Sequence, residues 1–132
     1  MKSLLNRQAR NGVAATEAAI LLPAFALLSF AAIESANAIY LQQSLALAAY
    51  EVASVIEDDN ASFEVAQDRC TAVLESRDIM SHDLSIIPEP NALVSGDVFS
   101  ISVSAPATTY SIGPSFFFQE AVLNANVIGV RH

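Results

Sequence analysis

The stretch "GVAATEAAILLPAFALLSFAAIESANAIYLQQSLALAAYEVA", residues 12–53, decides the fold of this chain. Between Val13 and Tyr50 its only charged residues are Glu17 and Glu34, and the 16 residues from 18 to 33 carry no charge. A membrane-spanning helix needs about 20 consecutive, mostly apolar residues. The stretch therefore predicts one long helix from about residue 14 to residue 57, of which residues 13–36 cross a membrane.

Charge is distributed unequally along the 132 residues, 53% of which are hydrophobic. Residues 1–12 hold three bases and no acid, a balance of +3, whereas residues 13–132 hold three bases and 14 acids, a balance of −11. A basic segment before an apolar one favours a cytoplasmic N-terminus, so we expect the acidic remainder to be exported. Its arginines are widely spaced in the sequence and form no basic patch, which excludes nucleic acid as a partner.

The outer half of the long helix has an amphipathic pattern. Apolar residues recur at helical spacing on one face, and these are Leu41, Leu45, Ala48, Val52 and Val55. We expect this stripe to pack on a small exported α/β domain, residues 58–132. The acidic segment "EDDN", residues 57–60, ends the helix.

A second, short helix follows, capped by Asn60 or Ser62, with Phe63, Ala66, Cys70 and Val73 on one face. The segments "DLSIIP", "DVFSISVSA" and "EAVLNANVIGVR" then have strand character, with strict alternation of apolar residues and serine in the second. The predicted fold class is α+β: a long N-terminal helix, a short helix and a small antiparallel sheet packed on the long helix.

Two cleavage sites are compatible with the N-terminus. A short basic leader, residues 1–12, ends at Gly12, and its removal makes Val13 the first residue of the mature chain. The alternative is ordinary signal-peptidase cleavage after Ala38, at the end of the small-residue pattern "ANA". That pattern is followed by more helical sequence, which favours the first site.

The combination of features in this segment resembles the TadE-like pseudopilins of the Tad (tight adherence) type IV pilus system. These features are the basic leader ending at Gly12, a new terminus at Val13, glutamate at the fifth mature position, Glu17, proline at the eleventh, Pro23, and a second glutamate, Glu34. The resemblance implies cleavage between Gly12 and Val13 by a prepilin peptidase. It also implies assembly with other pilins or pseudopilins at the inner-membrane platform of the Tad pilus, in support of pilus biogenesis and surface adhesion.

The chain departs from the major pilins of that system in two respects. It is much longer, and Ala18 stands where those pilins have a tyrosine after the glutamate. Both differences favour a minor pilin, or pseudopilin, role. The sequence does not separate a TadE-like member from a TadF-like one.

A physical role for Glu17 follows from cleavage at Gly12. The new α-amino group of Val13 has a reference pKa of about 7.7–8.0 and is mostly cationic near neutral pH. If neighbouring helices are staggered by about one turn, Glu17 of one copy faces the amine of the next, and the pair fixes their register. The competing interpretation is that Glu17 is a solvated residue at the level of the lipid headgroups.

Other residues of the long helix have expected roles of their own. Pro23 should bend the helix without breaking it. Glu34 should lie near the outer membrane boundary, about 25 Å from Glu17 along the axis. Small residues permit close packing of helices in the membrane, and these are Ala14, Ala15, Ala18, Ala19 and Ala24.

Two features outside the long helix allow more than one interpretation. The three consecutive aromatic residues Phe116, Phe117 and Phe118 either close the core or form an exposed patch for a partner. Cys70 is the only cysteine, so it forms no disulfide within the chain; it is either a buried small apolar residue or a site of intermolecular pairing.

The sequence contains no recognisable catalytic or metal-binding constellation. His82 and His132 are far apart, and Asp58 and Asp59 are better explained as residues of a solvated loop than as ligands. We therefore expect no cofactor, no metal and no enzymatic activity. Two rival functions stay open: an uncleaved, signal-anchored periplasmic accessory or binding protein, and a pseudopilin of a type II secretion system.

Overall fold

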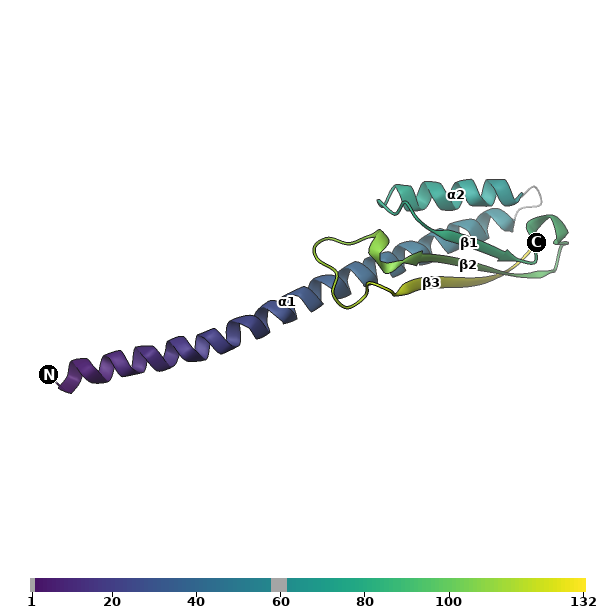
Figure 1. Cartoon of the computed structure of the whole chain (residues 1–132). Coiled ribbons are helices and arrows are strands. Elements are labelled where there is room, and N and C mark those ends of the chain that lie inside the picture. The colour runs from purple at the N-terminus through teal and green to yellow at the C-terminus, as the bar shows by residue number, and fades with distance from the viewer. Residues whose placement is uncertain (1, 58–61) are drawn as a thin grey trace.

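The structure, a computed structural model, describes the backbone of residues 2–57 and 62–132 and the side chains of residues 13–57 and 62–132. It contains two helices, α1 (Lys2–Ile56) and α2 (Phe63–Glu75), and three strands, β1 (Asp83–Ile87), β2 (Val98–Pro106) and β3 (Val122–Val130). Two short 3-10 helices flank β2: η1 (Pro90–Ala92) and η2 (Ala107–Thr109). This arrangement confirms the expected α+β fold class, and Figure 1 shows the first half of α1 standing clear of the other elements.

Helix α1 is a single helix of 55 residues. It begins well before the expected residue 14, because residues 2–11 contain neither proline nor glycine to stop the helix, and it runs through Gly12. It also continues through Pro23, so the expected absence of a break there is confirmed, and Figure 1 shows only a gentle curve along the helix. Its end at Ile56 agrees with expectation, while Asp58, Asp59 and Asn60 lie outside the described residues.

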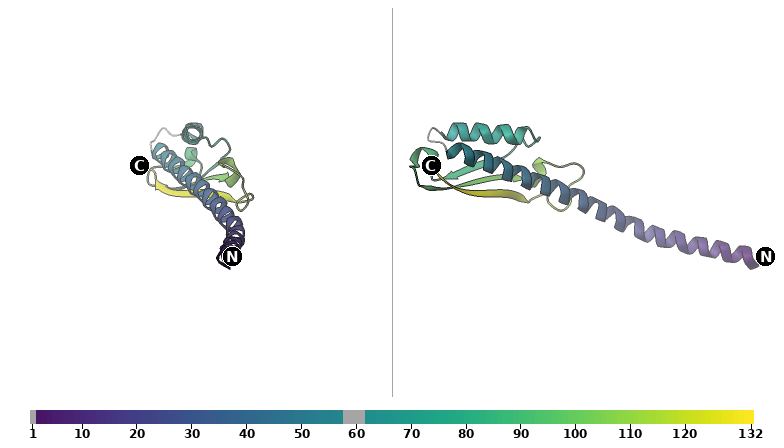
Figure 2. Two further views of the ribbon diagram at one scale, coloured as in Figure 1. Left: turned by 90° about the vertical axis from the view of Figure 1, so that its left-hand side faces the viewer. Right: turned by 180° about the vertical axis from the view of Figure 1, so that it is seen from behind.

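The amphipathic stripe of α1 forms the centre of the core, as expected. Leu41, Leu45, Ala48 and Val52 are completely buried, and Val55 is partly buried beside them. In both views of Figure 2, the second half of α1 lies between α2 on one side and the sheet on the other. The face of α1 that the sequence assigned to packing is therefore covered from two directions.

Helix α2 is capped by Ser62, whose hydroxyl oxygen accepts a hydrogen bond of 3.3 Å from the backbone N–H of Val65. Of the two expected caps, Ser62 is confirmed, and Asn60 lies outside the described residues. The helical spacing predicts that the face with Phe63, Ala66, Cys70 and Val73 packs in the core, and this is wrong for Phe63, whose ring is exposed in the first turn of the helix. The buried face of α2 consists of Ala66, Cys70 and Leu74.

The three strands form an antiparallel sheet in the order β1-β2-β3. On β2 the side chains of Phe99, Ile101 and Val103 are buried, while the serines between them face outward, which confirms the expected alternation. Phe99 is paired with Gly129 on β3. A Cβ atom at residue 129 would come within 2.8 Å of the Phe99 ring atom Cε2, so glycine leaves the space that the ring occupies.

Polar contacts connect α1 to both of its neighbours. The guanidinium of Arg69 on α2 forms an ion pair with Glu51 on α1, with an N–O distance of 2.7 Å. On the other side, the Gln42 side-chain amide donates a hydrogen bond of 2.6 Å to the carbonyl oxygen of Asn124 on β3. These contacts lie at the rim of the core, where exposed ion pairs contribute up to about 1 kcal/mol.

Cys70 should react very slowly with thiol reagents in the folded chain. Its side chain is completely buried, and burial raises the pKa of the thiol to about 11. At pH 8 the reactive thiolate fraction falls from roughly a quarter, for an ordinary pKa of about 8.5, to about 0.1%. We expect alkylation by iodoacetamide, followed by mass spectrometry, to be at least ~100-fold slower than for a cysteine on the exposed side of β2 (Ser100→Cys in a Cys70→Ala chain). Equal rates, or a disulfide-linked dimer on a non-reducing gel, would contradict the buried assignment.

Candidate functional site

The first half of α1 is an apolar helix without a covering surface in the described part of the chain. The candidate membrane span starts at Val13, and the window that identifies it has no buried residue. Large side chains are exposed on all sides of this part, among them Ile20, Leu22, Phe25 and Leu28. A helix that is apolar all round is stable in lipid or against other helices. By its length and composition, α1 fits a single-pass membrane anchor.

Glu17 lies one helical turn after Val13, and both side chains are exposed. The residue between them on this face, Thr16, donates a hydroxyl hydrogen bond of 2.7 Å to the carbonyl oxygen of Val13. The backbone bond between Gly12 and Val13 lies within α1, whereas the side chains of residues 1–12 are outside the described part. Glu17 is thus available for a contact between copies, and that contact stays a prediction.

Glu34 is the second acid of α1, and its position in the structure is unlike that of Glu17. Its side chain is only 4% exposed. One carboxyl oxygen accepts a hydrogen bond of 2.7 Å from the backbone N–H of Phe117, and the other accepts one from the N–H of Phe116. Glu34 therefore binds the backbone of the loop between β2 and β3, at a sequence separation of more than 80 residues.

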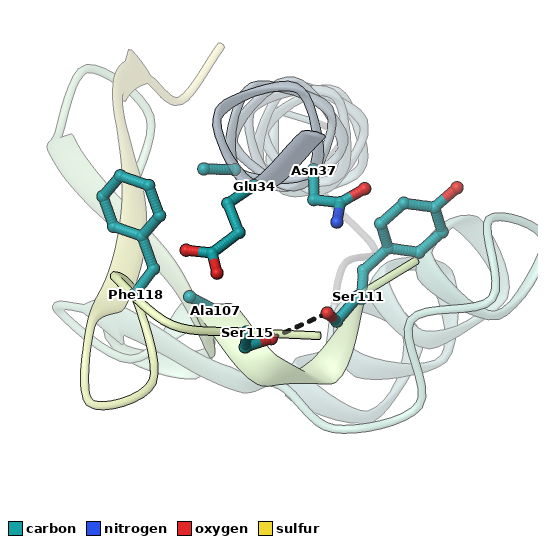
Figure 3. Close-up of a pocket in the computed structure, with 8 residues that line it drawn as sticks. Glu34, Asn37, Ala107, Ser111, Ser115 and Phe118 are labelled. Carbon is teal, nitrogen blue, oxygen red and sulfur yellow. Dashed lines mark hydrogen bonds between the residues drawn. The ribbon is translucent and has the colours of Figure 1, made fainter. Parts of the chain in front are cut away.

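A small pocket separates this part of α1 from the loop (Figure 3). Glu34 and Asn37 point into it from the helix, and Ser111 and Ser115 face them from the loop, joined by a hydrogen bond of 2.8 Å. The Asn37 side-chain amide also donates a hydrogen bond of 3.3 Å to the carbonyl oxygen of Ile112. Two neighbouring polar side chains of α1 thus hold two successive parts of the same loop.

The three aromatic residues of this loop, Phe116, Phe117 and Phe118, are not part of the buried core. Phe116 and Phe117 are each 59% exposed, and Phe118 is 37% exposed. The Phe116 ring packs on that of Phe30, with 5.7 Å between ring centroids. Of the two interpretations from the sequence, core closure is wrong for Phe116 and Phe117, because both are more than half exposed, while Phe118 lines the pocket beside Glu34.

The link between Glu34 and the loop was missed by the sequence analysis. It placed Glu34 near the outer membrane boundary but assigned it no partner. A buried acid on an otherwise apolar helix is a signal that some donor must satisfy it. The sequence gives no means of choosing the donor, because backbone N–H groups are present at almost every residue.

Within residues 13–57 and 62–132 no group of histidine, cysteine and acidic side chains could hold a metal ion. His82 contacts Thr71, with 3.3 Å between the ring Nε2 atom and the hydroxyl oxygen, and His132 is exposed at the C-terminus. Asp58 and Asp59, which were weighed as ligands, lie outside the described residues.

Comparison with known proteins finds one similarity, in the N-terminal segment. The chain has no significant match among curated proteins and none among solved structures. The model of one family, described as TadE-like protein, matches residues 12–54, from Gly12 to the last part of the buried stripe of α1. The matched segment includes Glu17, Pro23 and Glu34, which confirms the resemblance seen in the sequence and links the chain to Tad pilus systems. Residues 12–54, about a third of the chain, are thus similar to TadE-like proteins.

Proposed function

We propose that the chain is a minor pilin, or pseudopilin, that assembles with other pilins of a Tad pilus after a prepilin peptidase has removed residues 1–12. In this role it supports pilus biogenesis and adhesion, with α1 in the bacterial inner membrane and the α/β domain on the outer side. Its function is assembly, and it has no catalytic or cofactor-dependent part.

The observation that carries the proposal is the exposed half of α1. This half is apolar on all sides, and its one acid before Glu34 is Glu17, one turn from the proposed new terminus at Val13. Small residues at positions 14, 15, 18 and 19 lie around Glu17 and permit neighbouring helices to approach closely. A helix designed only to anchor a domain in lipid has no need of a charge at that place, since a charge in the apolar region is costly.

The proposed pairing of Glu17 and the Val13 amine has favourable energetics only between copies that are correctly aligned. In an apolar surrounding, either charge left without a partner costs several kcal/mol. Misaligned helices are therefore disfavoured, and the pair supplies axial register rather than overall affinity. The same argument explains why cleavage matters, because an uncut chain has an amide nitrogen at Val13 and no cation.

The rival with an observation in its favour is an uncleaved signal anchor. Helix α1 runs without interruption from Lys2 through residue 13, so the basic residues can serve as a cytoplasmic end of an intact helix. In that case the protein acts as a membrane-bound accessory factor and does not enter assemblies.

The mass of the mature protein distinguishes these functions. We expect the chain purified from membranes of cells with an intact Tad system to begin at Val13. In cells without the prepilin peptidase it should begin at Met1. A chain that begins at Met1 in both strains supports the anchor, and a chain found in the soluble fraction that begins at Ile39 supports ordinary secretion.

A further inference from the structure

The loop that Glu34 holds lies at a defined height on α1. From Val13 to Glu34 the helix rises through 21 residues, or about 32 Å at 1.5 Å per residue. The hydrocarbon core of a bilayer is about 30 Å thick. If Val13 is at the inner edge of that core, Glu34 is at its outer edge. Phe30, one turn earlier, then lies about 6 Å deeper, within the acyl chains.

The loop packs on one face of α1 across this boundary. Phe30, Ile33, Glu34 and Asn37 follow the spacing of a single helical face. The Phe116 ring contacts Phe30. A Cβ atom at Gly113, where φ is +101°, would lie 4.0 Å from the Ile33 side chain, so the loop backbone passes close to that residue too. The loop therefore extends to the depth of the last apolar turn of the membrane-spanning segment.

The composition of the loop suits a lipid environment. No charged residue occurs between Val98 and Gln119. Its large apolar side chains are well exposed: Ile112 is 65% exposed, and Phe116 and Phe117 are each 59% exposed. An apolar group of this size, continuous with the lipid-facing part of α1, has its favourable environment at the boundary of headgroups and acyl chains.

Backbone groups of the loop also need partners at that depth, because an unsatisfied N–H in lipid costs several kcal/mol. Glu34 supplies an acceptor to each of the N–H groups of Phe116 and Phe117. The Ser111 hydroxyl and the Gln119 side chain bind carbonyl oxygens within the loop, those of Gly113 and Ser115. Because Glu34 accepts hydrogen bonds from both N–H groups, Phe116 and Phe117 can enter lipid without leaving these backbone donors unsatisfied.

We propose that residues 111–119 form an interfacial anchor that inserts into the outer leaflet of the inner membrane, with Glu34 as the residue that positions it. The loop fixes the depth of α1 and holds the α/β domain against the membrane surface. The occupant of the exposed patch is lipid, and a contact of the same patch with another pilin is the alternative that the experiment separates. The proposal goes beyond the pilin function and does not depend on cleavage at Gly12.

The chain contains no tryptophan, so a single tryptophan can report on the loop. The full-length chain with Phe117→Trp is reconstituted in vesicles of phosphatidylethanolamine and phosphatidylglycerol, with and without brominated acyl chains. We expect blue-shifted emission, at least two-fold quenching by chains brominated near the headgroup, weaker quenching by chains brominated near the tail, and little quenching by aqueous acrylamide.

Two matched reporters calibrate the result. Phe25→Trp lies in the middle of the apolar segment and should be quenched most by deep bromines. Tyr50→Trp, on the domain half of α1 and 64% exposed, should be quenched by acrylamide alone. If Phe25→Trp is quenched and Phe117→Trp behaves like Tyr50→Trp, the interfacial anchor is refuted while the membrane span stands. If the Phe117→Trp emission is blue-shifted without bromine quenching and varies with the protein-to-lipid ratio, the patch contacts protein and the proposal is wrong.

The role of Glu34 is tested in the same reporter chain. Glu34→Ala removes both acceptors, so we expect bromine quenching of Phe117→Trp to fall by at least half and acrylamide quenching to rise. Glu120→Ala removes an exposed acid close to the loop and should change neither. Unchanged quenching in the Glu34→Ala chain, with its α-helix content intact by circular dichroism, would refute the positioning role.

Discussion

Replacement of Glu17 by alanine should leave the chain cut at Gly12 and bound to the membrane, but should reduce its incorporation into pilin assemblies at least ten-fold. The reason is the cost of an unpaired charge. Removing one partner of a buried ion pair costs about 3–5 kcal/mol, because the other charge stays buried without compensation. Here the charge left over is the Val13 ammonium of the neighbouring copy. Incorporation is measured as the fraction of the chain that copurifies with other pilins after membrane solubilisation.

Two further substitutions at this position isolate the charge. Glu17→Gln keeps the size and a hydrogen-bonding oxygen but loses the charge, so it should behave nearly as alanine does. Glu17→Asp keeps the charge on a shorter side chain and should be intermediate. Glu75→Ala, at an exposed acid of α2, is the matched control. Normal incorporation of the Glu17→Ala chain would instead identify Glu17 as a solvated residue at the headgroup level.

Substitution of Gly12 by isoleucine should abolish removal of the leader. Gly12 lies within α1, and a peptidase must open the helix there to reach the peptide bond. Glycine in a helix interior costs about 0.5–1 kcal/mol relative to alanine, so the helix opens more easily at this residue than at its neighbours. The β-branched side chain of isoleucine is restricted at χ1 and adds bulk beside the bond to be cut. Intact mass should show a chain that starts at Met1, and incorporation into assemblies should fall at least ten-fold.

The control for this prediction is Asn11→Ile, which places the same side chain one residue earlier and leaves the glycine in place. It should be processed at a rate within a few-fold of the unaltered chain. Gly12→Ala should be cut slowly. If the Gly12→Ile chain still begins at Val13, glycine is not the determinant of the site. If it retains the leader yet assembles normally, the free amine at Val13 has no part in assembly.

Local periodicity accounts for the parts of the structure that the sequence predicted well. The stripe that includes Leu41, Leu45 and Val52 repeats at helical spacing, and the alternation around Ile101 repeats at strand spacing. Each pattern shows which residues of one helix or strand lie on the same face. This is determined by the local backbone geometry, so it can be read from neighbouring residues in the sequence.

The contact between Glu34 and residues 116–117 could not be predicted in this way. It joins positions 82 and 83 residues apart through backbone N–H groups, which carry no residue-specific signal. The orientation of the phenylalanine rings follows from that contact and not from their own spacing. The start of α1 was also misjudged, because the helix continues on the N-terminal side of the proposed cleavage site, where no residue stops it.

The loop on α1 has a geometric consequence for any assembly of these helices. Because residues 111–119 cover the face of Phe30, Ile33, Glu34 and Asn37, a neighbouring helix can follow that face only as far as the turn before Phe30. A neighbouring helix can contact the full length of the membrane-spanning segment only on the other sides of α1. The sides of α1 are therefore not equivalent: the side under the loop allows only a short helix–helix contact, and the other sides allow a long one. In an assembly, this difference would restrict how each subunit is rotated about its helix axis relative to its neighbours.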